Sequence, residues 1–516
     1  MLASRRLTLL AAATLVGACS ASAPPGGAPP AGAPAPRGAD AAFPALDAIR
    51  EADLRRDLYA LAGDHFRGRE AGTLDELRAS VWLAEQARAA GLEPAGDDGT
   101  YFQWWSIRRY RISDDSRIAI DGQPVRLFAE AAVLAPVDTT VDAPILFVEP
   151  GAPVDSAAVR GRVVATELVP PADVSAAALQ RYGPGAVRRA AAPFVRLGAA
   201  AVVVVSDTLA EARFGAGGDL MERGRYGVDS AGFTAYWPDA RGGARRPQGG
   251  APVIWVRRAL LDRLRAPDAR LTARLTTENF LYPSVNIVGR VPGTDPALRD
   301  EYVLYSGHQD HDGVRTAVDG DSIWNGADDN GTVSVAMLAI ARAFHQAPGR
   351  RPVLFVWHGA EERGLLGSRH FVMHPTVPKE QIAAVLNADM IGRNDPDSAA
   401  LLGAQPPHRN STALVEMALR ANQTVTRFAL DTLWDRPTHR ERWYFRSDHL
   451  PYARAGVPAI EFSTNLHPDY HTPRDEPGRI DYAKLARMTR WMYATGWLVA
   501  NAAQRPGVDP GFRLER

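Results

Sequence analysis

The fold is decided by the stretch Tyr302-Val303-Leu304-Tyr305-Ser306-Gly307-His308-Gln309-Asp310, in which a short apolar run ends in a histidine and an acid. Apolar runs of about four to eight residues are typical of buried strands. Similar runs recur at 285–288, 352–357, 383–386 and 457–462, and helical patterns follow at 333–346, 411–421 and 482–502. This alternation predicts an α/β domain with a mostly parallel central sheet.

Polar residues follow several of these predicted strands. In an open α/β sheet, ligands bind beyond the carboxyl ends of the strands, so these side chains are expected to meet at one edge. All but one of the 12 histidines, the exception being His65, lie between His308 and His471. The residues concerned are His308 and Asp310, Asp328-Asp329 before the helix at 333–346, Glu361-Glu362, Asp389, and Asp469-Tyr470-His471.

Each of these pieces also has a structural explanation. Asp328-Asp329 is suited to capping a helix N-terminus, and Glu361-Glu362 is suited to a first helical turn. Taken together, however, several carboxylates at one sheet edge would repel one another without a cation. Histidine and carboxylate ligands without thiolates suit Zn²⁺, with Mn²⁺ and Co²⁺ as alternatives.

The composition excludes several other classes of protein. The chain has 516 residues, of which 46% are hydrophobic, and Lys+Arg and Asp+Glu both number 59. With no basic excess, binding to nucleic acid is not expected. The absence of a phosphate-binding loop argues against a nucleotide. The only cysteine, Cys19, leaves no thiolate for a zinc site in the body of the chain.

The N-terminal residues predict export. Arg5-Arg6 precedes an apolar stretch at 7–16, which predicts a signal peptide over residues 1–18. Val16-Gly17-Ala18-Cys19 resembles a bacterial lipobox, so Cys19 is expected to carry a lipid anchor in a membrane, with 19–42 as a Pro/Ala/Gly-rich tether. We therefore expect a lipoprotein of the bacterial cell envelope that faces the periplasm or the exterior. No other apolar run approaches the roughly 20 residues of a transmembrane helix.

The remaining chain divides into two parts, one of which is inserted into the other. Helical patterns at 44–63 and 73–91 precede a series of short strand-like runs, and the stretch 214–250 is expected to form long loops. We assign 43–125 and 281–505 to the domain that carries the predicted metal site and 126–280 to a β-rich insertion. The insertion contains no titratable cluster with the spacing of metal ligands.

The motifs resemble those of the co-catalytic dizinc aminopeptidases, a family that includes glutamate carboxypeptidase and the non-catalytic transferrin receptor. The resemblance is carried by His-x-Asp at 308–310, Gly-Ala-Asp-Asp-Asn-Gly at 326–331, Glu-Glu at 361–362, Asn-Ala-Asp-Met-Ile-Gly at 387–392 and Tyr-His-Thr-Pro-x-Asp at 470–475. Residues 66–70 and 91–97 are similar to the N-terminal part of that family. Residues 126–280 resemble its protease-associated domain, chiefly at Leu197-Gly198-Ala199-Ala200. The resemblance implies a three-layer zinc-peptidase domain with a mostly parallel sheet.

The same resemblance implies a site with two Zn²⁺ ions. One metal would be held by His308 and Asp389 and the other by Glu362 and His471, with Asp329 bridging them across a cis peptide bond to Asn330. Behind these ligands, Asp310 would orient the ring of His308, and Asp475 would orient that of His471.

The resemblance also assigns roles in catalysis. Glu361 would act as general base on a water that bridges the metals, so that hydroxide attacks the peptide carbonyl. Tyr470 would stabilise the oxyanion, or would merely be a packed aromatic. Ser447-Asp448-His449 resembles a family segment near the substrate pocket, and Tyr444 nearby would line a site for an apolar side chain.

The function expected from these features is release of N-terminal residues from peptides. A carboxypeptidase of the glutamate carboxypeptidase type is an alternative, and it would need arginines such as Arg363, Arg393 and Arg446 at the pocket. Glutaminyl cyclase, a relative with one zinc and an incomplete ligand set, fits less well. A catalytically silent, receptor-like binding protein is disfavoured because the ligands and Glu361 are all present.

Overall fold

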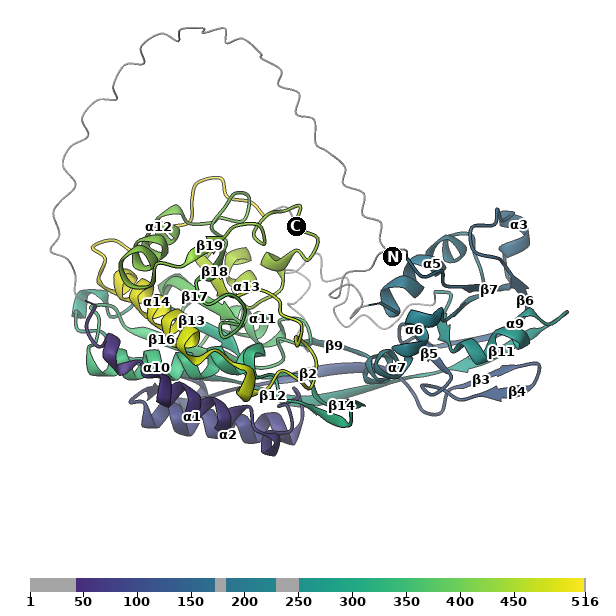
Figure 1. The fold of residues 1–516 in the computed structure, drawn as a ribbon, viewed down its shortest axis with the longest axis horizontal. Coiled ribbons are helices and arrows are strands. Elements are labelled where there is room, and N and C mark those ends of the chain that lie inside the picture. Colours follow the sequence, from purple (N-terminus) through teal and green to yellow (C-terminus); the bar gives the residue numbers. More distant parts are fainter. Residues whose placement is uncertain (1–42, 172–181, 229–249, 515–516) are drawn as a thin grey trace, which may run out of the picture. The chain divides into compact units, whose positions relative to one another are not determined.

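The computed structural model describes residues 43–171, 182–228 and 250–514 (Figure 1). The predicted signal peptide, Cys19 and the tether lie outside the described residues. The part from Phe43 onward forms one compact unit that contains two large sheets. The predicted helices near 44–63 and 73–91 are present as α1 (Glu51–Leu61) and α2 (Leu74–Ala89).

Four parallel strands form the centre of the first sheet. They lie in the order β20 (Ala459–Ser463), β17 (Ile382–Asp389), β13 (Tyr302–His308) and β16 (Val353–His358). Each neighbouring pair is parallel. Because parallel strands point the same way, their carboxyl ends lie at one edge of the sheet.

The outer strands of this sheet are largely antiparallel, which corrects the prediction of a mostly parallel sheet. On one side β18 pairs antiparallel with β20, and on the other β12 pairs antiparallel with β16. Only β18 and β19 form a further parallel pair. The sheet is therefore mixed. The prediction failed at the edges because a strand-like sequence pattern does not indicate the direction in which the strand will pair. These outer strands are β19 (Ala429–Asp431), β18 (Ser398–Leu402), β12 (Thr277–Val291), β2 (Phe102–Ile112), β9 (Arg225–Val228) and β1 (Glu93–Pro94).

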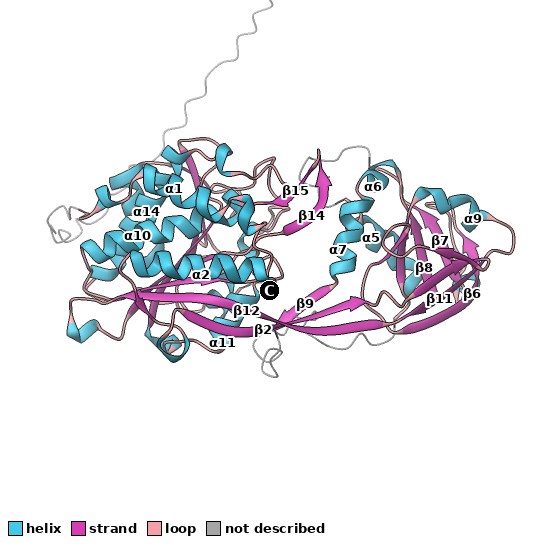
Figure 2. Cartoon of the chain, turned by 90° about the horizontal axis from the view of Figure 1, so that it is seen from below, coloured by secondary structure: helices cyan, strands magenta, loops and turns pink. Residues whose placement is uncertain are grey.

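Helices cover both faces of the sheet (Figure 2). Alternate residues of β13 face opposite ways: Tyr305 packs in one hydrophobic cluster and Leu304 in another. The first cluster is completed by α1, α2, α10 (Val333–Gln346), α12 (Thr412–Ala421) and α14 (Tyr482–Asn501). The second is completed by α11 (Leu366–Met373) and α13 (His449–Arg454). This is a three-layer arrangement of helices, sheet and helices.

The second sheet lies in sequence between β2 and β12. Its strands follow the order β4 (Gln123–Val125), β3 (Arg117–Ile120), β11 (Arg270–Leu275), β6 (Thr139–Phe147), β7 (Val163–Glu167), β8 (Ala201–Val205), β10 (Val253–Val256) and β5 (Ala131–Val133). The helices of this region are α3 (Ser156–Val159), α5 (Pro184–Arg196), α6 (Thr208–Ala212), α7 (Phe214–Arg223) and α9 (Leu261–Arg265).

Two predictions about this insertion are wrong. The first boundary falls before β3 rather than at residue 126, because β3 and β4 form a hairpin that pairs with β11. The stretch 214–250 was expected to be loops, but its described part contains α7 and β9. Glycines hide the helical pattern of α7, and β9 is stabilised by pairing with the distant strand β2.

Candidate metal centre

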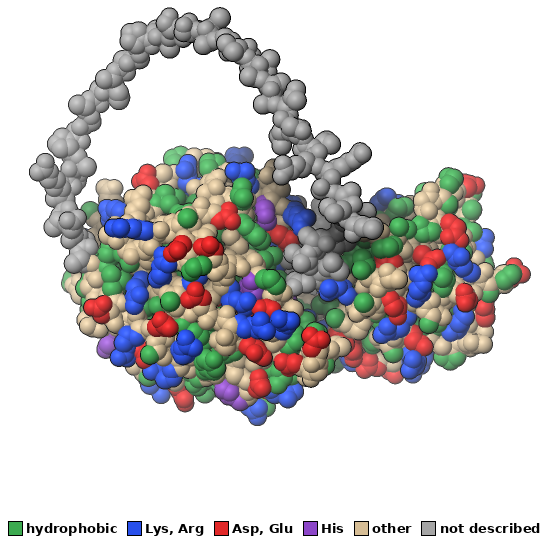
Figure 3. All heavy atoms as spheres, in the orientation of Figure 1, with side chains coloured by type: hydrophobic (Ala, Val, Ile, Leu, Met, Phe, Trp, Pro, Cys, Tyr) green, Lys and Arg blue, Asp and Glu red, His purple; other side chains and the backbone are tan. Residues whose placement is uncertain are grey.

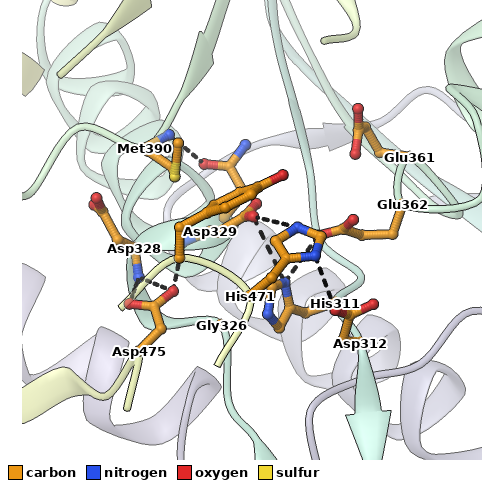
Figure 4. Close-up of polar contacts among 12 residues, drawn as sticks. His311, Asp312, Gly326, Asp328, Asp329, Glu361, Glu362, Met390, His471 and Asp475 are labelled. Carbon is orange, nitrogen blue, oxygen red and sulfur yellow. Dashed lines mark hydrogen bonds and ion pairs between the residues drawn. The ribbon is translucent and has the colours of Figure 1, made fainter. Parts of the chain in front are cut away.

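The predicted site residues meet at the carboxyl edge of the parallel strands. His308 is the last residue of β13, Asp389 is the last residue of β17, and Glu361 and Glu362 follow β16. Asp329 lies in a turn, Ala327–Thr332, directly before α10. The first three elements are neighbours in the sheet, so the carboxylates converge although they are far apart in sequence. Figure 4 shows Asp329, Glu361 and Glu362 in this region.

One cluster forms around the imidazole of His308. Its Nε2 lies 3.3 Å from Oδ1 of Asp329, 3.6 Å from Oδ2 of Asp389 and 3.7 Å from Oε2 of Glu361. His308 has no exposed surface, and the three carboxylates are nearly as buried. One ring nitrogen therefore faces three carboxylates in the protein interior.

A second cluster forms around His471 and shares Asp329 with the first. Nε2 of His471 lies 3.1 Å from Oδ2 of Asp329 and 3.2 Å from Oε1 of Glu362. His311, which the sequence did not single out as a ligand, places Nδ1 3.0 Å from the same oxygen of Glu362. Figure 4 shows the rings of His311 and His471 directed at Asp329 and Glu362.

Both clusters have the chemistry of metal sites. Donor atoms of His308, Glu361 and Asp389 lie within 4.8 Å of one another, and so do those of a second group, His311, Asp329, Glu362 and His471. Several of these buried atoms have no hydrogen-bond partner, which costs free energy unless a further group satisfies them. They are Nε2 of His308, Oδ1 of Asp389, Oε1 of Glu362 and Nε2 of His471. A mixed imidazole and carboxylate donor set fits Zn²⁺.

The turn that carries Asp329 is held by Asp475. The carboxylate of Asp475 accepts hydrogen bonds from the backbone N–H groups of Asp328, at 2.9 Å, and Asp329, at 3.0 Å. The peptide bond between Asp329 and Asn330 is cis, as predicted. Asn330 in turn donates from its amide to the carbonyl of Ala388, next to Asp389.

The expected role of Asp475 on His471 is therefore wrong, and Asp312 occupies that position. Oδ2 of Asp312 lies 3.0 Å from Nδ1 of His471. Asp475 is only four residues from His471, but its side chain is already used by the turn before α10. The sequence pattern His-Gln-Asp-His-Asp at 308–312 could have identified both His311 and Asp312 as residues of the site.

Asp310 also differs in detail from its predicted role. Its backbone carbonyl, 3.1 Å from Nδ1 of His308, receives the ring N–H, whereas its carboxylate lies 3.8 Å from that nitrogen. The carboxylate accepts the backbone N–H of Glu361 at 2.9 Å instead. Asp310 thus links the loop after β13 to the loop after β16.

Arg69 is a further element that sequence reasoning missed. Its fully buried guanidinium donates to the carbonyls of Gln309 at 2.8 Å, Asn325 at 2.7 Å and Gly326 at 2.9 Å, and to that of Leu61 at 3.2 Å. These carbonyls belong to the loops that carry His308 and Asp329. A single cation therefore ties the two loops together.

The adjacent carboxylates Glu361 and Glu362 have opposite pKa shifts. Burial raises the pKa of Glu361 well above its ordinary value, and the nearby carboxylate of Glu362 adds to the shift. Burial would also raise the pKa of Glu362, but His471 and His311 outweigh it and hold that pKa well below its ordinary value. Such a division between neighbours is typical of residues with different roles.

Tyr470 lies at the rim of the second cluster. Its hydroxyl accepts a hydrogen bond from Nη2 of Arg446 at 2.8 Å. Burial raises the pKa of Tyr470 to about 12, so the hydroxyl keeps its proton at neutral pH. The guanidinium of Arg446 also stacks on Trp443, at 4.5 Å from its ring.

The four predicted pocket residues lie in the interior rather than on an open pocket. Tyr444 stacks on His408 with ring centroids 4.2 Å apart, and Nδ1 of His449 lies 3.0 Å from Glu461. Ser447 accepts a hydrogen bond from Asn387. Tyr444, Ser447, Asp448 and His449 are all at most 1% exposed. They support the site from behind, because α13 packs under β17 and β20.

Comparisons with known proteins agree with this geometry. Residues 286–496 match the model of peptidase family M28. Aminopeptidase YwaD of Bacillus subtilis is 29% identical over 167 residues, which cover 31% of this chain and 34% of that protein. A probable leucine aminopeptidase 1 of Trichophyton verrucosum is 27% identical, over 42% of this chain and 58% of its own length. The chain thus spans less than two thirds of these relatives.

A solved structure shows the same fold over most of the chain. BSAP, a zinc aminopeptidase from Bacillus subtilis, superposes with a TM-score of 0.56 at 18% identity, covering 90% of this chain and 99% of that one. The fold and the two clusters define the class of co-catalytic metallopeptidases. Within that class, residues 286–496 are the part that matches the model of peptidase family M28.

In the ranges that the structure describes, none of the helices combines the length and apolar character needed to cross a bilayer.

Proposed function

We propose that the chain is a zinc aminopeptidase that removes N-terminal residues from peptides. The observation that carries this proposal is the pair of buried histidine–carboxylate clusters joined by Asp329. The names of the relatives supply the reaction class, since several are aminopeptidases.

In this proposal the residues of the two clusters would hold two Zn²⁺ ions. His308 and Asp389 would be ligands of one ion, Glu362 and His471 would be ligands of the other, and Asp329 would be shared by both. Bound ions would acidify a water molecule and polarise the peptide carbonyl. Nδ1 of His311, 3.0 Å from Oε1 of Glu362, helps to position that carboxylate.

Glu361 moves the proton. It takes a proton from the attacking water and delivers it to the nitrogen of the leaving amine, so that no net proton is consumed by the enzyme. Its raised pKa favours holding a proton between the two steps. The backbone N–H of Glu361 is fixed by Asp310, which limits the positions its side chain can take.

Tyr470 donates a hydrogen bond to the oxyanion that develops on the carbonyl oxygen. Its hydroxyl accepts from Arg446, and this leaves its own proton available for the substrate. The positive charge of Arg446 strengthens that donor.

Each arginine expected for the carboxypeptidase alternative already has a partner in the described structure. Arg393 pairs with Asp469 at 2.8 Å, Arg446 is engaged with Tyr470, and Arg363 pairs with Glu70 at 3.1 Å. A peptide panel with free and acetylated N-termini tests the choice. Hydrolysis of free but not acetylated peptides supports the aminopeptidase, and equal hydrolysis of both contradicts it. No hydrolysis by zinc-loaded protein would favour the receptor-like alternative.

The N-terminal region and the insertion complete the proposal. We assign Cys19 as the lipidated residue of a bacterial envelope lipoprotein and the insertion as a protease-associated domain. Labelled fatty acid should be incorporated by the natural chain and not by Cys19→Ala, whose catalytic part should remain active. Labelling of the variant would contradict the anchor at Cys19.

A further inference from the structure

A cavity of about 410 Å³ adjoins the candidate metal centre at Glu362. Its other walls come from the loop after β16 and from the insertion, through α5, the end of α7 and the start of β9. The lining residues that matter here are Arg188, Arg223, Arg225, Tyr226, Glu362 and Arg363. Four are arginines, and among the described lining residues the only acid is Glu362.

The charge excess is specific to this cavity and does not follow from the arginine content of the chain. A neighbouring cavity of about 360 Å³ shares Arg223 and Tyr226 with it. That cavity is lined by Arg109, Arg223 and Arg315 together with Glu70, Asp219 and Glu222, so its charges balance. In the first cavity, Glu362 is also the carboxylate assigned to a metal ion, so no acid of its described lining is left to balance Arg188 and Arg225.

Two of the four arginines are held in place by acidic residues. The side chain of Arg363 is only 5% exposed and lies 3.1 Å from Glu70 and 3.5 Å from Asp312. Its buried Nε has no hydrogen-bond partner. Arg223 also forms an ion pair with Glu70. These contacts hold the guanidinium groups in place without satisfying all of their donors.

The other two arginines have no acidic partner within the described ranges. Both are exposed residues that line the same cavity, and they are close enough for their like charges to interact. Like charges are placed together at a cost, which an anion between them would offset. Arginine is suited to this task because its planar fork binds a carboxylate through two hydrogen bonds.

We infer that this cavity binds a carboxylate of the peptide substrate, beside the metal centre at Glu362. The inference rests on the proposed peptidase function and narrows its substrate class. The carboxylate belongs to the free C-terminus of a short peptide or to an acidic side chain on the C-terminal side of the cleaved bond. In either case it positions the peptide, and salt weakens its binding.

The experiment compares matched substrates that differ by one charge. Leu-Ala is compared with Leu-Ala-amide, and Leu-Glu-amide with Leu-Gln-amide, at low and high salt. A hydrogen-bonded charge pair is worth about 1.5–3 kcal/mol, so the anionic member should have a kcat/KM about tenfold to a hundredfold higher. A preference in the first pair identifies the C-terminus, and one in the second identifies the side chain.

Variants then locate the preference. Arg225→Gln and Arg188→Gln should each reduce the ratio between anionic and neutral substrates about tenfold, and Arg225→Glu should reverse it. Arg196→Gln, an exposed position at the end of the same helix as Arg188, should leave the ratio unchanged. Equal kcat/KM for both members of both pairs in the natural chain would overturn the inference. Because free N-termini would still be required for cleavage, that outcome would leave the proposed aminopeptidase function standing.

Discussion

Asp312 lies 3.0 Å from Nδ1 of His471, on the opposite side of the ring from the nitrogen that faces Asp329 and Glu362. A carboxylate at this position holds the imidazole in the tautomer whose Nε2 lone pair faces the metal centre. It also makes that nitrogen a stronger donor, a common arrangement behind metal-binding histidines.

Asp312→Asn should therefore weaken the metal site that contains His471. Partners of this kind are worth about tenfold to a hundredfold in metal affinity, and activity should fall with occupancy at limiting zinc. Titration of chelator-treated protein with zinc measures the effect. The matched control is Asp319→Asn, an exposed aspartate of the same β14–β15 hairpin (Gly313–Val318 and Asp321–Trp324). Equal affinities for the two variants would show that Asp312 does not support the site.

Glu361 and Glu362 should respond differently to the same substitution. Glu361→Gln removes the proton acceptor, so kcat should fall about 10²–10⁴-fold while both metal ions and KM are largely retained. Glu362→Gln removes a ligand and should lower metal content as well as rate. Elemental analysis beside steady-state kinetics separates the two. If Glu361→Gln loses metal and Glu362→Gln does not, the assigned roles are exchanged.

Arg69 should be essential for stability. Replacing it with Met leaves four carbonyls without their donor and releases the loops of His308 and Asp329. We expect a loss of several kcal/mol in the free energy of unfolding, because each buried acceptor left unsatisfied costs about 1–3 kcal/mol. Arg290→Met, at an exposed arginine paired only with Glu93, should cost less than about 1 kcal/mol. Denaturant unfolding of the two proteins checks the difference.

Glu76 should make stability depend on pH. Burial raises the pKa of its carboxyl group from 4.5 to about 8. Between these values the folded chain holds a proton that the unfolded chain has released, so the free energy of unfolding falls as pH rises. The slope is about 1.4 kcal/mol per pH unit at most. Glu76→Gln should lose this slope, and Glu85→Gln, an exposed control on the same helix, should keep it. Parallel slopes for Glu76→Gln and the natural chain would contradict the prediction.

Much of the core and of the candidate site was readable from the sequence. The central strands and the helices α10, α12 and α14 could be predicted because the spacing of apolar residues reflects burial directly. The convergence of His308, Glu361, Glu362 and Asp389 could be predicted because the carboxyl ends of parallel strands share one edge, whereas the choice of Asp329 rested on the family resemblance. In these cases local sequence and position along a strand carry the information.

Other features depend on contacts between distant segments, and only the tertiary structure decided them. The antiparallel outer strands, the start of the insertion at β3 and the pairing of β9 with β2 are set by which edges meet. Likewise, Asp312 rather than Asp475 lies against His471, and Arg69 reaches loops 240 and 256 residues away. The sequence specifies the chemical type of each side chain. Which partner the side chain contacts depends on the packing of elements that are far apart in the sequence.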